Sequence, residues 1–130
     1  MNLPAILDAK SVDVFMNVES SHCYGDIEAF FRGVVHALKD DGTFVYIDYR
    51  MTVDMEDFLK VVKKYFDIVN FEDVTKKVAR SLRLQDDDKQ LKLKPLLPWY
   101  HRLLFNDFAG TTDSLVYREY EHQVRSYFAY

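Results

Sequence analysis

The sequence predicts an α/β fold in which short buried strands alternate with amphipathic helices. Two observations lead to this prediction. Residues 12–18 form a short apolar run that passes directly into a dense polar segment, and a second strand-like run, residues 43–49, follows a segment with helical spacing. In an open α/β sheet, a strand whose carboxyl end opens into polar residues is typical of the edge where ligands bind.

The segment between these two strands is predicted to be an amphipathic helix that begins after Asp26. Its apolar residues recur at positions 27, 30, 31, 34, 35 and 38, which places them on one face of a helix. Asp26 is a suitable N-cap, and Gly42 is expected to close the turn after the helix. Residues 43–49 are nearly continuous in apolar side chains, as in a strand that is covered on both faces.

The sequence after residue 50 is predicted to form mainly helices, with two further short strands. A helix from Asp54 has apolar residues at positions 55, 58, 59, 62 and 66. Pro95 and Pro98 exclude a continuous helix through the segment that contains them. The further elements that we expect are a short strand over 67–71, a helix over 74–84, a break at 86–88, a helix over 100–108 ending at Gly110, a helix over 113–122 and a strand over 124–130.

Composition narrows the class of protein. With 130 residues, 48% of them apolar and 29% charged, the chain is long enough for one globular domain with its own core. The net charge of −4 and the lack of a basic stripe argue against a nucleic-acid partner. No apolar run approaches the ~18–20 residues that span a bilayer. The single cysteine, Cys23, excludes an internal disulfide, and we therefore expect a reducing, cytoplasmic location. The four histidines lack the spacing of known zinc motifs, so no metal site is expected.

The polar segment carries a family motif. Residues 12–24 read VDVFMNVESSHCY, residues 39–42 read KDDG, and the second strand ends in Asp48-Tyr49-Arg50. This pattern resembles class I S-adenosylmethionine (SAM) dependent methyltransferases of the small-molecule and lipid-modifying, type 11-like kind, in which "NVESSHCY" is followed by a helix, "LKPGG" and a strand ending in "DxR". Residues 1–4, MNLP, are similar to the family's "ENLPF".

The resemblance covers nearly the whole chain but only the C-terminal half of the family's fold. It implies a single partial domain over residues 1–130, with strands four to seven of a Rossmann-like sheet in the order 4-5-7-6, flanking helices and a helical, lid-like insertion over about 73–112. The family's Gly-rich cofactor loop is missing, since no G-x-G occurs in this sequence. Strand 12–18 would then be an exposed edge. We therefore expect a homodimer through this strand, a swapped assembly, or a partner chain that supplies the missing half.

The resemblance also implies the cofactor SAM and the roles of the residues after the first strand. Asn17 and Val18 would line the cofactor, while Glu19 and His22 would face the methyl group and the acceptor. His22 is the natural general base on an acceptor hydroxyl, because imidazole titrates near neutral pH. Glu19 would orient His22 or hold the acceptor, and Tyr24 would form an aromatic wall. The alternative is a simple capped loop whose serines satisfy backbone groups.

Four further residues are expected to bind the substrate, a small-molecule acceptor. Asp48 and Arg50 would shape the acceptor site, with an ordinary surface ion pair as the alternative. Trp99 and Tyr100 lie in an apolar, aromatic segment that suits a lid over a lipid-like molecule, with packing against the core as the alternative.

Two functions remain open on these grounds. The first is a SAM-dependent methyltransferase for small hydroxylated or lipid-like acceptors, incomplete without the missing N-terminal half. The second is a non-catalytic, truncated methyltransferase-fold module that acts in binding or oligomerisation. A fragment of a longer gene product is a third possibility, which the sequence does not separate from the second.

Overall fold

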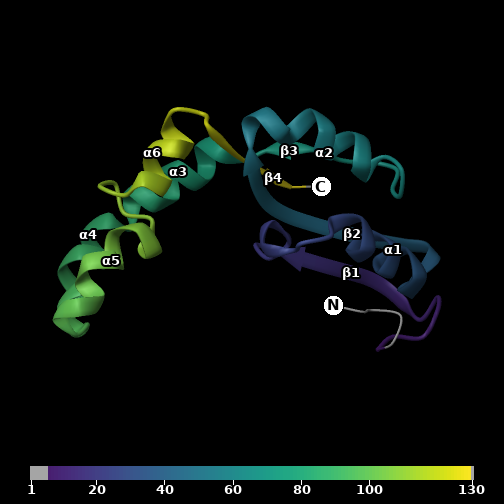
Figure 1. The fold of residues 1–130 in the computed structure, drawn as a ribbon, viewed down its shortest axis with the longest axis horizontal. Helices are drawn as coiled ribbons and strands as arrows, with labels where there is room; N and C mark the ends of the chain where they lie inside the picture. Colours follow the sequence, from purple (N-terminus) through teal and green to yellow (C-terminus); the bar gives the residue numbers. More distant parts are fainter. Residues whose placement is uncertain (1–5, 130) are drawn as a thin grey trace. The chain divides into compact units, whose positions relative to one another are not determined.

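The computed structural model describes residues 6–129, except for the side chain of Leu103, so the "ENLPF"-like start of the chain and Tyr130 lie outside the described residues. The chain divides into two compact units, residues 6–73 with 127–129 and residues 74–126. The elements of the first unit are β1 (Val12–Val18), η2 (Ser21–Cys23), α1 (Ile27–Ala37), β2 (Leu38–Met51), η3 (Thr52–Asp54), α2 (Met55–Val62), β3 (Glu72–Asp73) and most of β4 (Arg125–Ala129) (Figure 1).

The four strands form one sheet in the order β1-β2-β4-β3. β1 and β2 run parallel, and β3 and β4 run antiparallel. With the strands counted along the chain as four, five, six and seven, this is the order 4-5-7-6, so the predicted α/β sheet is confirmed. β1 is the first strand of the order and therefore lies at an edge of the sheet.

The junction between α1 and β2 differs from the prediction. β2 begins at Leu38, directly after the helix, and residues 39–42 lie within it rather than in a turn. The register of the β1–β2 ladder shifts near the start of β1, as at a β-bulge. A Cβ on Gly42 would come within 3.0 Å of the Lys39 carbonyl and 3.2 Å of the Asp13 carbonyl. Close backbone approach at the bulge, and not a left-handed turn, therefore accounts for this glycine.

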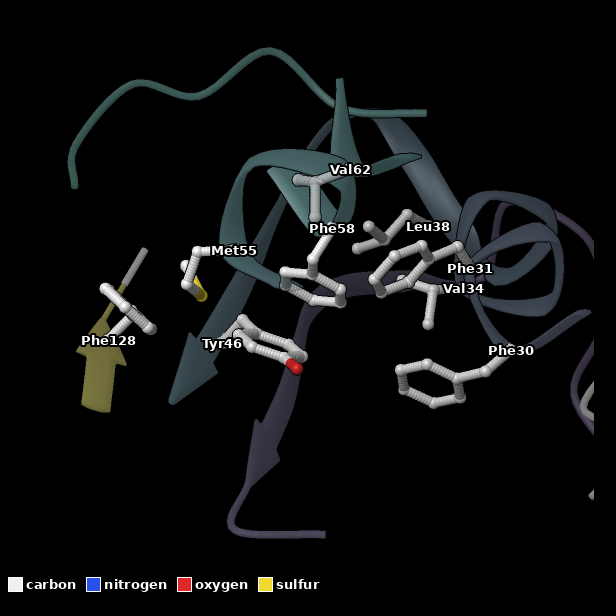
Figure 2. Packing of buried hydrophobic residues seen from close by; sticks show 9 residues of the cluster. All are labelled: Phe30, Phe31, Val34, Leu38, Tyr46, Met55, Phe58, Val62 and Phe128. Carbon is white, nitrogen blue, oxygen red and sulfur yellow. The ribbon is translucent and has the colours of Figure 1, made fainter. Parts of the chain in front are cut away.

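The core of the first unit lies between the sheet and the helices α1 and α2. Asp26 caps α1 as predicted, since its side chain accepts from the Ala29 N–H at 2.8 Å. Phe31 and Val34 on the apolar face of α1 are fully buried. Figure 2 shows the buried cluster, which consists of Phe30, Phe31, Val34, Leu38, Tyr46, Met55, Phe58, Val62 and Phe128. Burying these side chains is the main stabilising contribution to this unit.

The opposite face of the sheet is open at β1. Phe15 packs toward the core cluster, whereas Val14, Met16 and Val18, which point the other way along the strand, are exposed. The neighbouring residues of β2 on that face, Val45 and Ile47, are half-buried. The expectation of a second strand covered on both faces is therefore wrong, because only one face is fully packed. Within residues 6–129, β1 thus presents both a free edge and an apolar face.

The second unit is helical. It contains α3 (Thr75–Leu84), α4 (Asp86–Asp88), the π-helix η4 (Lys89–Leu93), η5 (Lys94–Leu96), α5 (Trp99–Ala109), α6 (Leu115–Glu121) and the first residues of β4 (Figure 1). The predicted insertion over about 73–112 falls almost wholly within this unit, which continues to Ser126. No helix of residues 6–129 has the length and apolar content needed to cross a bilayer.

Four local predictions for the chain from residue 67 onward have different outcomes. The break at residues 86–88 is wrong, because the helical backbone continues through them as far as Leu96. The interruption by proline is confirmed at Pro98, which is extended and precedes α5, but it is wrong at Pro95, which lies within the 3-10 helix η5. Gly110 ends α5 with φ 60° and ψ 42°, a left-handed conformation that glycine adopts at little cost. The short strand expected over 67–71 is instead β3, at Glu72–Asp73.

Candidate active site at the carboxyl ends of the parallel strands

The candidate site lies where β1 and β2 end side by side. Because the two strands are parallel, the loop after β1 and the last residues of β2 meet at one edge of the sheet. Glu19 turns the chain sharply at the end of β1: its φ is +47°, and its N–H donates to the Ile47 carbonyl at 2.8 Å. A non-glycine residue in this left-handed region is uncommon and is often found at functional sites.

Asp48 of β2 anchors the loop after β1. Its buried carboxylate accepts from the N–H of Ser21 at 2.7 Å, the Ser21 hydroxyl at 2.7 Å and the N–H of His22 at 3.1 Å. It also lies 2.7 Å from Nδ1 of His22 and accepts from the N–H of Tyr49 at 2.9 Å. One buried side chain of β2 therefore holds both the backbone of the loop and the imidazole ring.

These contacts favour the ionised form of Asp48 and one tautomer of a neutral His22. Burial raises the pKa of Asp48, but the hydrogen bonds from Ser21, His22 and the Tyr49 N–H outweigh it, so the pKa lies below its ordinary value and the group is a carboxylate at neutral pH. A carboxylate only accepts, so in the neutral imidazole Nδ1 of His22 carries the hydrogen and Nε2 keeps its lone pair. The ring stacks on Tyr49 with centroids 4.2 Å apart, and 22% of the His22 side chain is exposed.

Arg50 and Tyr46 lie next to the Ser21 hydroxyl that donates to Asp48. Nη2 of Arg50 donates to the Ser21 hydroxyl at 2.8 Å and to the Tyr46 hydroxyl at 3.1 Å, and the guanidinium lies 4.6 Å above the ring of Phe58. Burial raises the pKa of Tyr46 to about 12, against the opposing effect of Arg50. The surface ion-pair interpretation of Asp48 and Arg50 is therefore wrong, because Asp48 is buried and Arg50 donates to Ser21 and Tyr46.

The C-terminal strand also reaches the site. The hydroxyl of Tyr127, a buried residue of β4, donates to the carboxylate of Glu19, and its ring lies 6.4 Å from that of Tyr49. Glu19 was expected to orient His22. The carboxylate that contacts the His22 ring is that of Asp48 instead. Sequence reasoning missed Tyr127 because it is 108 residues from Glu19 and stands in an unremarkable aromatic run.

Asn17 lies beneath the loop rather than on its surface. The residue is buried, and its Oδ1 accepts from the Ser20 hydroxyl at 2.7 Å and from the Tyr24 hydroxyl at 3.3 Å. Its Nδ2 is buried without a hydrogen-bond partner. Tyr24 packs edge-on against Phe30, with centroids 4.9 Å apart, whereas Val18 is exposed. Asn17 and Tyr24 therefore support the loop from the inside.

The capped-loop alternative does not describe this arrangement. Ser20 makes no side-chain cap, and its hydroxyl donates to Asn17 instead. The hydroxyl of Ser21 bonds to Asp48 rather than to the backbone. The two serines thus connect the loop to the side chains of both strands.

The two predicted lid residues belong to the second unit. Trp99 and Tyr100 begin α5, are exposed, and contact each other edge-on with ring centroids 5.9 Å apart. The alternative that they pack into the core is therefore wrong. Among residues 6–129, no group of three or more His, Cys, Asp or Glu side chains is placed to hold a metal ion.

Comparison with known sequences finds methyltransferases. No family model matches the chain. The phthiotriol/phenolphthiotriol dimycocerosates methyltransferase of Mycobacterium leprae is 25% identical over 130 residues, which are 99% of this chain and 47% of the relative. That of Mycobacterium tuberculosis is 47% identical over 49 residues, which are 38% of this chain and 17% of the relative. The chain therefore spans less than half the length of either relative.

Solved structures with the same fold are also methyltransferases. The O-methyltransferase of a trans-AT polyketide synthase multienzyme from Brevibacillus brevis, in complex with S-adenosylhomocysteine, has a TM-score of 0.69 and 18% identity, covering 95% of this chain and 44% of its own. Phosphoethanolamine N-methyltransferase 2 from Haemonchus contortus, in complex with SAM, has a TM-score of 0.71 and 12% identity, covering 95% and 33%. The chain thus has the fold of the C-terminal portion of a class I SAM-dependent methyltransferase, as the sequence motif implied.

Proposed function

We propose that this chain is the acceptor-side half of a SAM-dependent O-methyltransferase that acts on a small hydroxylated or lipid-like molecule. The observation that carries the proposal is the pair of His22 and Asp48 at the carboxyl ends of β1 and β2. A buried carboxylate that fixes the imidazole tautomer leaves Nε2 as a base for a hydroxyl group. The names of the mycobacterial relatives, which refer to phthiotriol lipids, support a hydroxylated, lipid-like acceptor.

In the proposed reaction, residues of this chain accept and release the proton of the acceptor hydroxyl. When bound, SAM would supply a methyl group on a sulfonium, with a neutral thioether as the leaving group. Nε2 of His22 would take the proton that the acceptor hydroxyl loses on methylation. Asp48 stabilises the resulting imidazolium, which returns the proton to water after the product leaves. Glu19, whose carboxylate accepts from Tyr127, would bind a further acceptor hydroxyl.

The residues present fit only part of the cofactor. The unpartnered Nδ2 of Asn17 offers a donor at the end of β1, and Val18 beside it offers apolar surface. The sequence has no G-x-G loop to approach the rest of the cofactor closely. We therefore propose that Asn17 and Val18 line one side of bound SAM and that a second polypeptide segment holds the other side.

We expect that segment to pair with the free edge of β1. Within residues 6–129 the strand lies at the end of the sheet order and exposes the side chains of Val14, Met16 and Val18, and an apolar edge of this kind favours pairing with another strand. The segment would come from the missing half of the fold or, as a homodimer, from a second copy of this chain.

The second candidate function is a non-catalytic module for binding or oligomerisation. The position of β1 at an edge of the sheet favours it, because an edge strand suits association with another chain. This candidate requires no base at His22, and the two functions therefore differ in what a substitution at that residue does.

The test combines this chain with the N-terminal half of its Mycobacterium leprae relative and follows the formation of S-adenosylhomocysteine on a hydroxylated lipid acceptor. If His22 is the base, His22→Ala should lower turnover by about 10²-fold. Cys23→Ala, which changes an exposed neighbour of the same loop, is the matched control and should leave turnover unchanged. Turnover that His22→Ala does not affect would remove His22 from the mechanism, and absence of turnover in every combination would favour the non-catalytic module.

A further inference from the structure

Helix α5 of the second unit turns an apolar side toward solvent. Its inward residue, Phe105, is buried, while Tyr100, Leu104 and Phe108 follow one another at intervals of four and are 52%, 70% and 94% exposed. Trp99 at the start of the helix is 74% exposed. A helix on the surface of a globular protein normally shows the reverse pattern, with polar side chains outward.

The turns that precede α5 also carry exposed apolar side chains. Leu91, Leu93 and Leu96 of η4 and η5 are also exposed. Arg102 of α5 fixes the two parts together, since it donates to the Leu97 carbonyl at 2.8 Å and to the Pro95 carbonyl at 2.7 Å. We call the exposed apolar side chains of this segment the apolar stripe; they are Leu91, Leu93, Leu96, Trp99, Tyr100, Leu104 and Phe108. A concentration of this kind marks an interaction surface.

The unit that carries the stripe is basic, although the chain as a whole is acidic. Residues 74–126 contain ten Lys and Arg against seven Asp and Glu, whereas the rest of the chain contains seven against fourteen. Within residues 76–102 the ratio is eight to three. Lys76, Arg80, Lys92 and Arg102 are exposed, and Lys92 is ion-paired with Asp88 at 2.6 Å. The occupant of this surface should therefore be both apolar and negatively charged.

We propose that the second unit binds peripherally to an anionic lipid bilayer, with the apolar stripe inserted at the level of the headgroups. Tryptophan, tyrosine, leucine and phenylalanine beside lysine and arginine are the composition of helices that lie in the membrane interface. Anionic headgroups attract basic segments and lose this attraction as salt screens it. This surface lies in a different unit from the His22–Asp48 pair, so the proposal goes beyond methyl transfer and does not depend on it.

Trp99, the sole tryptophan in the sequence, is a built-in reporter for the test. The intact chain is mixed with phosphatidylcholine vesicles, with and without phosphatidylglycerol, and its fluorescence and co-sedimentation are measured. We expect a blue shift of Trp99 and protection from acrylamide with the anionic vesicles, weak binding to the neutral ones, and loss of binding in high salt. The double variant Leu104→Ser/Phe108→Ser keeps the tryptophan and should weaken binding at least about tenfold.

The matched control places the same substitutions on exposed apolar residues of the first unit, as Val53→Ser/Val69→Ser, and should bind vesicles as the unchanged chain does. Circular dichroism of both double variants checks that they are folded. Equal binding to neutral and anionic vesicles, or unchanged binding by the α5 double variant, would overturn the proposal. A blue shift produced by the N-terminal half of a methyltransferase, with none produced by vesicles, would assign the stripe to a protein partner and also overturn it.

Discussion

Nδ1 of His22 lies 2.7 Å from Oδ1 of Asp48, at the point where the two parallel strands of the sheet end. The same carboxylate accepts from the N–H groups of Ser21 and His22, so the loop and the ring are held by one buried group. This arrangement serves stability and reactivity together: it fixes the loop after β1, and it leaves Nε2 of His22 as the nitrogen with the free lone pair.

Asp48→Asn should lower the free energy of unfolding by about 2–4 kcal/mol. The amide has nearly the shape of the carboxylate but presents one donor group to Ser21 and His22, which already donate, and so leaves buried donors unsatisfied. Urea unfolding followed by circular dichroism measures the change. Asp41→Asn, at an exposed position of β2, is the control and should shift the free energy of unfolding by less than about 0.5 kcal/mol. A shift of similar size in both variants would contradict the anchoring role.

The pH dependence of unfolding should reveal the same group. The pKa of Asp48 is lower in the folded than in the unfolded chain, so its stabilisation is present above the unfolded value of about 4 and is lost as the pH falls through the folded value. The difference in unfolding free energy between the unchanged chain and Asp48→Asn should therefore shrink as the pH is lowered from 7 toward 2. A difference that stays constant over this range would show that ionisation of Asp48 contributes nothing.

Tyr46 should ionise at a higher pH than an ordinary phenol. Burial raises its pKa to about 12, so it stays neutral where exposed phenols with a pKa of about 10 are charged. Its stabilising contribution is full below the unfolded pKa and is lost as the pH rises through the folded value. Absorbance titration should lose its highest-pH component in Tyr46→Phe, provided that circular dichroism shows the chain to be folded there. Loss of a component near pH 10 would be the contrary result.

Tyr127→Phe should loosen the loop without unfolding the sheet. The substitution keeps the ring of β4 but removes the donor to Glu19, and hydrogen bonds to charged groups contribute about 1.5–3 kcal/mol. Amide hydrogen exchange over residues 19–24 should therefore become faster. Tyr65→Phe removes a tyrosine–glutamate bond at the surface, to Glu28, and should leave exchange in that loop unchanged. Equal exchange in both variants would remove Tyr127 as a support of Glu19.

Features that depend on neighbouring residues in the sequence can be predicted from it, whereas features that depend on contacts between distant segments cannot. The helix after Asp26 and the end of α5 at Gly110 depend on local spacing and capping, and both follow from the residues themselves. The strand order was predicted only from the resemblance to methyltransferases. The sequences of residues 12–18 and 43–49 indicate strands but not their positions in a sheet. The helical backbone continues through the acidic residues 86–88, although three consecutive aspartates are not a typical helical sequence.

The site shows the same division. His22 and Glu19 stand in the motif and were expected, but the partner of each was not. Asp48 meets His22 because the parallel register brings the ends of β1 and β2 together across 26 residues, and Tyr127 meets Glu19 across 108. Such contacts are set by tertiary packing, which a single sequence does not display.

The measurement that tests the central claim most directly is isothermal titration of S-adenosylhomocysteine into this chain, alone and after mixing with the N-terminal half of its Mycobacterium leprae relative. A half-site predicts weak or no binding by the chain alone and micromolar binding by the mixture, because the loop that approaches the cofactor is then present. No binding by either at millimolar ligand would contradict the account and leave the chain as a methyltransferase fold retained for association.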